Sequence, residues 1–272
     1  MSPGALKPGD SPADNTGMGS TAESDALHWR HEADRLLGRD DARGALLTYD
    51  KALTLDPFAH ACWLGKGKAL EAIGREDEAL DHCDIAANLA PHSFAAFEAK
   101  GLLLHKRGAF IAALACFEWA SVVGEANAFT AAWALNYRGA TLIRLGRLEE
   151  ALACCDAGLE LYRMAVLWLT RGNALRNLRR FDEAIASHNQ ALALDPRCGA
   201  ARFNRGLAEE DQGRIRAAIR SYQQCLEVSD LDVALEQRVR RQLASAMRQR
   251  NRELIDARAR RPFTADAHGR AS

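Results

Sequence analysis

Apolar residues recur along most of the chain with spacings of three and four, and short polar turns interrupt them at regular intervals. This spacing is typical of amphipathic helices, whereas a half-buried strand would alternate with a period of two. Alanine and leucine are abundant and β-branched residues are sparse, which also favours helix. The pattern therefore predicts a series of short helices in pairs. The turns within the pairs read GRDDARGA, GREDEA, KRGAFIAA, GRLEEA, RRFDEA and GRIRAA.

The helix pairs repeat with a fixed length. Pro57 and Pro91 are 34 residues apart, and one aromatic and three small residues precede each of them at the same offsets. Residues 168–196 carry the same skeleton. A period of 34 residues predicts a helical solenoid, in which small residues allow two helices to cross closely and proline ends the second helix. The matching residues are Trp29, Ala33, Ala45 and Ala52; Trp63, Gly67, Ala79 and Ala86; and Trp168, Gly172, Ala184 and Ala191.

Three further copies are less regular. Gly101, Gly139 and Gly206 stand in register with the small residues of the regular copies, but 38 residues rather than 34 separate Gly101 from Gly139. Other residues replace the proline in the third and sixth copies and the aromatic residue in the sixth, namely Glu125, Asp230 and Arg202. We therefore expect six repeats over residues 26–230, the last of them degenerate, as terminal repeats often are.

The two ends of the chain differ from the repeats. Residues 1–25 are rich in glycine, proline, serine and aspartate, which predicts a disordered tail, and residues 261–272 are expected to form another. Residues 231–260 predict one long helix, whose stripe of Leu235, Val239 and Leu243 would cap the open end of the stack. From residue 231 onward the chain contains ten arginines and five acidic residues. Contact with nucleic acid or an acidic partner is therefore the alternative interpretation of this helix.

Composition narrows the class of protein. The formal net charge is zero, so no global field recruits nucleic acid or a membrane, and no apolar run is long enough to span a bilayer. Seven cysteines without a CxxC motif indicate reduced thiols in the cytoplasm. No phosphate-binding, zinc-binding or nucleophile motif occurs. The sequence therefore predicts a protein without a catalytic site, metal site or cofactor.

The repeated skeleton resembles the tetratricopeptide repeat family over residues 27–230, most closely in the first, second and fifth copies. The resemblance implies an all-α fold, a right-handed superhelical solenoid of about six antiparallel helix pairs with the capping helix at its C-terminal end. It also implies that the first helices line a concave groove, which in this family commonly binds peptides or protein segments.

The candidate groove residues lie on the face of each first helix next to the one that carries the small residues. Asparagine offers a donor and an acceptor to an extended peptide backbone, and arginine can hold a carboxylate with two parallel hydrogen bonds. The alternative is that these residues are simply the polar part of a solvated helix face. The predicted site comprises Lys68, Asn136, Tyr137, Arg144, Asn173, Arg176, Asn177, Phe203 and Asn204.

We therefore expect a non-enzymatic scaffold that binds a peptide or partner protein in the concave groove. One alternative is an accessory or regulatory subunit of a separately encoded enzyme or secretion system. Another is association with nucleic acid through the arginine-rich C-terminal helix. The sequence identifies neither the partner nor the pathway, and it leaves open the oligomeric state and whether the groove or the outer and terminal surfaces form the main binding site.

Overall fold

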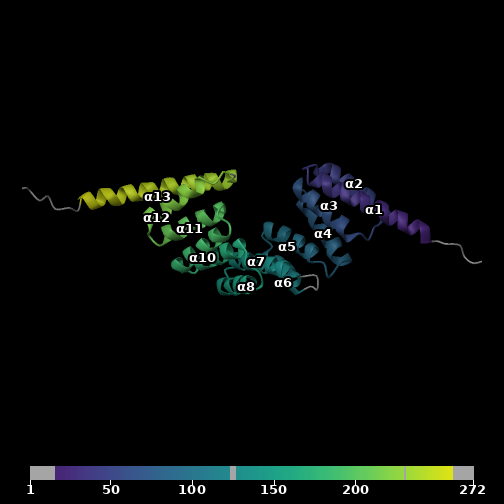
Figure 1. The fold of residues 1–272 in the computed structure, drawn as a ribbon, viewed down its shortest axis with the longest axis horizontal. Helices are drawn as coiled ribbons and strands as arrows, with labels where there is room; N and C mark the ends of the chain where they lie inside the picture. Colours follow the sequence, from purple (N-terminus) through teal and green to yellow (C-terminus); the bar gives the residue numbers. More distant parts are fainter. Residues whose placement is uncertain (1–15, 123–126, 230, 260–272) are drawn as a thin grey trace, which may run out of the picture. The chain divides into compact units, whose positions relative to one another are not determined.

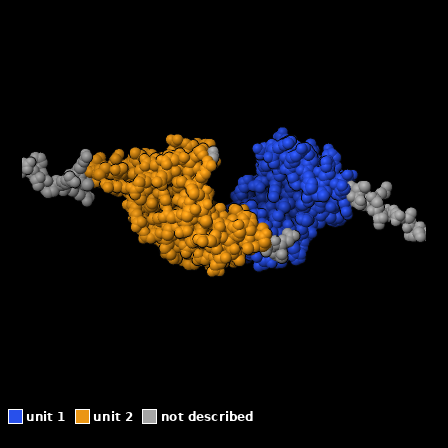
Figure 2. All heavy atoms as spheres, in the orientation of Figure 1, with its two compact units in different colours: residues 1–125 blue, residues 126–272 orange. Residues whose placement is uncertain are grey.

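The computed structural model describes residues 16–122, 127–229 and 231–259, and within these ranges it contains thirteen helices and no strand (Figure 1). Most of the predicted tails, residues 1–15 and 260–272, lie outside the described residues. The chain divides into two compact units, residues 1–125 and 126–272, which Figure 2 shows in separate colours. The division falls in the connection that the sequence marks as irregular.

Each unit consists of helix pairs joined by short turns. The first contains α1 Thr16–Leu37, α2 Ala42–Leu55, α3 His60–Ala72, α4 Glu76–Leu89, α5 Phe94–Lys106 and α6 Phe110–Val122. The second contains α7 Ala128–Arg144, α8 Leu148–Leu161, α9 Ala165–Asn177, α10 Phe181–Leu194, α11 Gly199–Asp211, α12 Ile215–Leu226 and α13 Val233–Ala259. The prediction of a helical solenoid is confirmed. α1 begins earlier than the repeat pattern predicts, within the segment that was assigned to the N-terminal tail.

Small residues hold the two helices of each pair close together. The alanines that recur in the second helices have no exposed surface in any repeat, and they are Ala45, Ala79, Ala113, Ala151, Ala184 and Ala218. Opposite them, Gly101 lies against the ring of Phe117 and Gly172 against the ring of His188. A Cβ atom added at Gly172 would lie only 2.4 Å from Cε1 of His188, so a larger residue would force the helices apart.

The turn inside each pair needs one residue in the left-handed backbone region. Glycine fills this position in four turns, with φ between +74° and +81°, at Gly74, Gly108, Gly146 and Gly213. Asp40 and Arg179 adopt φ of +62° and +61° in the other two. Aspartate tolerates this region better than most residues, whereas arginine carries the full steric cost of its Cβ atom.

The first helices form one layer within each unit. α1 contacts α3 and α3 contacts α5, and in the second unit α7, α9, α11 and α13 contact one another in that order. Among the described residues, second helices of successive repeats make no such contacts. The first helices are therefore the inner layer, and the second helices splay apart on the outside.

The C-terminal helix α13 completes this layer and caps the stack. Its Val239 and Ala246 are fully buried in a cluster with Ile215, Tyr222 and Cys225 of the last repeat. Its predicted apolar stripe is therefore covered by the last repeat, because Leu235 and Leu243 pack against the same cluster. Beyond this contact the helix extends into solvent, where Leu254 and Ile255 are exposed (Figure 1).

Candidate binding surface

The inner face of the second unit carries a row of polar side chains that bond from one first helix to the next. The hydroxyl of Thr170 on α9 donates to Oδ1 of Asn136 on α7 at 2.7 Å. The amide of Asn204 on α11 donates from Nδ2 to Oδ1 of Asn173 on α9 at 2.9 Å. These hydrogen bonds run across the helix axes, so the amides of successive repeats lie side by side.

Charged groups continue the same row toward the C-terminal end. The guanidinium of Arg176 donates from Nε to Asp211 at 2.6 Å, between α9 and α11. The carboxylate of Glu210 then accepts from Gln242 of α13 at 2.9 Å and from the hydroxyl of Tyr222 at 2.6 Å. The inner face of this unit is therefore polar and internally bonded.

The predicted site residues lie at different depths. Lys68, Arg144 and Asn177 are exposed, whereas Tyr137, Asn173, Arg176 and Asn204 are half-buried. Two others are buried, Asn136 at 7% exposure and Phe203 at 4%. Asn136 already accepts from Thr170, and Phe203 packs between the ring of Tyr222 and the guanidinium of Arg238. The burial of Asn136 and Phe203 favours a structural role for them. A ligand can reach only the exposed and half-buried residues of the predicted site.

Lys68 belongs to the first unit, where it lines a hollow of about 410 Å³ between α1 and α3. Arg30 and Asp34 line the α1 side of this hollow. Asp34 accepts a hydrogen bond from the hydroxyl of Tyr49, which positions its carboxylate at the floor. The inner face of the first unit therefore offers a lysine, an arginine and an oriented carboxylate, separate from the amides of the second unit.

The model for the tetratricopeptide repeat matches residues 31–94 and 169–237. These ranges cover nearly all of the three copies with the most regular spacing, and helix pairs with the same close crossing continue between them. The chain belongs to the tetratricopeptide repeat family.

Solved structures show the same fold. A tetratricopeptide repeat protein from Parabacteroides merdae has a TM-score of 0.69 at 16% identity, covering 91% of this chain and 95% of that one. YrrB, a tetratricopeptide repeat protein with an unusual peptide-binding site, has a TM-score of 0.50 at 19% identity, covering 71% and 97%. A structure of the Cut9–Hcn1 hetero-tetramer has a TM-score of 0.65 at 18% identity and covers 84% of this chain but 46% of that one. This chain therefore spans about half the length of that match. No curated protein matches it.

Several residues of the inner row escaped the sequence prediction. Thr170, Asp211 and Gln242 all take part, although none was placed on the predicted groove face. Their partners lie 32 to 35 residues away, close to one tetratricopeptide repeat length. A search for complementary polar residues one repeat apart on the first helices would have found them.

Four buried thiols are poorly suited to nucleophilic chemistry. Burial raises the pKa of the Cys83 and Cys155 thiols to about 12, and that of the Cys62 and Cys225 thiols to about 11, so each stays protonated and a poor nucleophile at neutral pH. Within the described ranges, no group of three histidine, cysteine or acidic side chains could hold a metal ion. None of the described helices is both long and apolar enough to cross a membrane.

Proposed function

We propose that this tetratricopeptide repeat protein is a non-enzymatic scaffold that holds a peptide, or a segment of a partner protein, on the inner face of its first helices. The observation that carries the proposal is the amide pair of Asn173 and Asn204. Their mutual hydrogen bond uses one acceptor lone pair of Asn173 and one N–H group of Asn204. The NH₂ group of Asn173 and the carbonyl of Asn204 are left to bond outward.

These two groups match the chemistry of an extended peptide. A peptide backbone alternates N–H donors and C=O acceptors, so one residue of the ligand can accept from Asn173 and donate to Asn204. Such contacts recognise backbone rather than sequence. The neighbouring Arg176 uses its Nε atom for Asp211, and its terminal N–H groups can add a charged contact to an acidic side chain of the ligand.

The structural neighbours support a scaffold role, and the cysteines support a reducing compartment. YrrB shares the fold and is described as having a peptide-binding site, and the Cut9–Hcn1 structure is a protein assembly. The seven cysteines are free thiols, which suits a reducing compartment such as the cytoplasm.

The test compares two double variants of the full chain as bait for proteins from the native cell. One carries Asn173→Ala and Arg176→Ala on the inner face. The matched control carries Arg216→Ala and Gln223→Ala, which remove the same kinds of group from exposed positions of α12. Captured proteins are identified by mass spectrometry, and circular dichroism checks that both variants stay folded.

We expect the inner-face variant to lose at least one protein that the wild type and the control both retain. Equal capture by all three would refute the assignment to the inner face. Retention on double-stranded DNA that falls steeply with salt, and that depends on the arginines of α13, would instead favour the nucleic-acid alternative. Turnover by the purified chain alone would refute the non-enzymatic proposal.

A further inference from the structure

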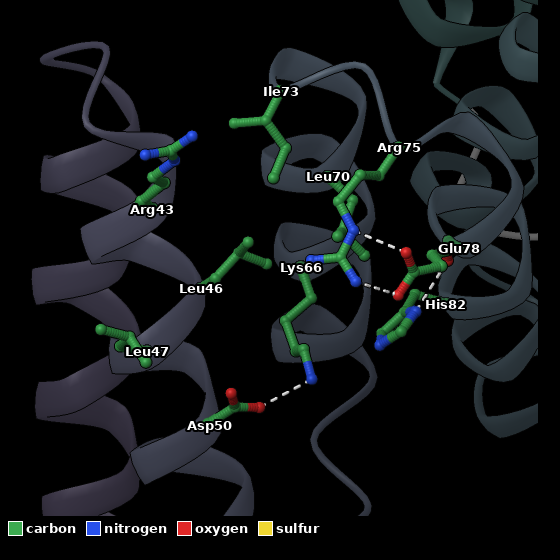
Figure 3. Close-up of a pocket in the computed structure, with 10 residues that line it drawn as sticks. All are labelled: Arg43, Leu46, Leu47, Asp50, Lys66, Leu70, Ile73, Arg75, Glu78 and His82. Carbon is green, nitrogen blue, oxygen red and sulfur yellow. Dashed lines mark hydrogen bonds and ion pairs between the residues drawn. The ribbon is translucent and has the colours of Figure 1, made fainter.

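An open crevice of about 590 Å³ lies on the outer side of the first unit, between α2, α3 and α4 (Figure 3). Its floor is apolar, because Leu46, Leu70 and Ile73 line it from two helices. Leu47 stands beside them and is 68% exposed. An apolar side chain of a ligand could cover these leucines and gain free energy from their burial.

The rim of the crevice is charged. Lys66 donates to Asp50 at 2.7 Å, and Arg75 holds Glu78 through two N–H groups, one of them at 2.5 Å. Arg43 is different, since it forms no ion pair with any residue that the structure describes. Figure 3 shows its side chain extending from α2 toward Ile73.

An acid occupies the place of Arg43 in three of the other repeats. It is Asp77 in α4, Glu149 in α8 and Asp182 in α10, whereas the third repeat has Ile111 and the sixth has Arg216. Asp182 forms an ion pair with Arg214 at 3.0 Å, in the turn of the following repeat. Asp77 likewise pairs with Arg107 of the next repeat at 2.6 Å. At these two places an acid of the chain itself pairs with an arginine of the next repeat.

The crevice of the first unit departs from this charge pattern. Arg43 stands where the fifth repeat has Asp182, and Arg75 stands where Arg214 follows it. The acid nearest to Arg43 in the sequence, Asp41, lies two residues before it, accepts from the backbone N–H of Gly44 and caps α2. The crevice therefore has two guanidinium groups, of which Glu78 pairs with one, and it lacks the bridging acid.

We propose that this crevice binds an acidic peptide segment of a partner protein. A bulky apolar side chain of the segment packs on Leu46, Leu70 and Ile73. A neighbouring glutamate or aspartate supplies the carboxylate that the repeat pattern omits, and it accepts two parallel hydrogen bonds from Arg43. The site is formed by the outer crevice of the first unit, so it does not depend on the inner-face residues of the second unit.

The experiment titrates the ¹⁵N-labelled full chain with a synthetic peptide of alternating glutamate and leucine, and follows the amide chemical shifts. A second peptide has glutamine in place of each glutamate. The decisive variant is Arg43→Asp, because it places next to Arg75 the acid that the second, fourth and fifth repeats carry. The control variant is Arg216→Asp, which makes the same charge change at the equivalent, exposed position of α12.

We expect the acidic peptide to shift amides of α2, α3 and α4, and to bind Arg43→Asp at least tenfold more weakly than the wild type or Arg216→Asp. Absence of binding to the wild type, equal binding by Arg43→Asp, or equal binding of the glutamine peptide would each overturn the proposal. Shifts confined to the inner face would assign the peptide to the other surface. Loss of binding in the Asn173→Ala and Arg176→Ala variant, with Arg43→Asp unaffected, would likewise overturn this site without touching the scaffold proposal.

Discussion

Replacing His188 by phenylalanine should stabilise the second unit and remove a dependence of its stability on pH. His188 lies on α10 with no exposed surface, and its ring contacts Gly172. Neither ring nitrogen has a hydrogen-bond partner among the described residues. The equivalent residue of the third repeat is Phe117, which fills the same space against Gly101. Phenylalanine therefore suits this position, and it carries no polar atom that must be left unbonded.

The expected gain in the free energy of unfolding at neutral pH follows from the two unbonded nitrogens of the buried ring. A buried polar group without a partner costs about 1–3 kcal/mol, so His188→Phe should raise the free energy of unfolding by roughly that amount. A titration effect adds to this at lower pH. Burial, helped by the positive charges of Arg176 and Arg205, lowers the pKa of His188 from 6.5 to about 4.

Proton binding determines whether stability rises or falls with pH. Above pH 6.5 the imidazole is neutral in the folded and unfolded states, so it causes no pH dependence. As the pH falls from 6.5 to 4, the unfolded chain binds a proton that the folded chain cannot accept, and the folded state loses stability. The loss is about 1.4 kcal/mol per pH unit and approaches about 3 kcal/mol near pH 4.

The assay is urea unfolding of the wild type and His188→Phe between pH 4.5 and 8, followed by circular dichroism. The difference in the free energy of unfolding between the two proteins should be constant above pH 7 and widen steadily below pH 6.5. Carboxylates titrate in both proteins and cancel in the difference. His60→Phe, at an exposed histidine of α3, serves as the control for the substitution itself. A constant difference across the whole range would show that His188 titrates normally, and the reasoning from its burial would be wrong.

Three other predictions concern the repeats and their cap. Arg179→Gly should raise the melting temperature in calorimetry by stabilising the left-handed turn by about 1 kcal/mol, and an unchanged or lower value would show that this turn carries no strain. Gly101→Ala should destabilise the first unit by about 1–3 kcal/mol in urea unfolding, because its Cβ atom would lie 2.6 Å from Cε1 of Phe117; a neutral effect would mean that the helices separate freely. Deletion from Leu231 onward uncovers the cluster that Val239 and Ala246 bury, so we expect aggregation in light scattering, and a soluble, helical monomer would contradict the capping role.

The architecture could be predicted from the sequence because only small residues fit where two helices cross closely. A side chain larger than alanine or glycine collides at Gly101 or Gly172, so the 34-residue spacing of small residues reports helix packing directly. The turn residue is less constrained, since aspartate and arginine can occupy the left-handed region at a cost. Asp40 and Arg179 could therefore not be recognised as turn residues by type alone.

The depth of the inner-face residues was harder to predict. Asn136 and Phe203 occupy the same repeat position, three residues before the glycine of their helices, and so does the buried Leu64. The next position on the same face, that of Lys68 and Asn173, stays open or half-open. Helical periodicity gives the direction of a side chain, but the closeness of the neighbouring repeat decides whether a ligand can reach it.

The place of α13 in the inner layer has a consequence for the length of the protein. This helix contacts α11 as a first helix does, buries Val239 and Ala246 against the last pair, and supplies Gln242 to the polar row. It therefore packs as the first helix of a seventh pair would. Because its contacts are those of any first helix, one further 34-residue module could be spliced ahead of it with the register intact. The array is in this sense modular in length.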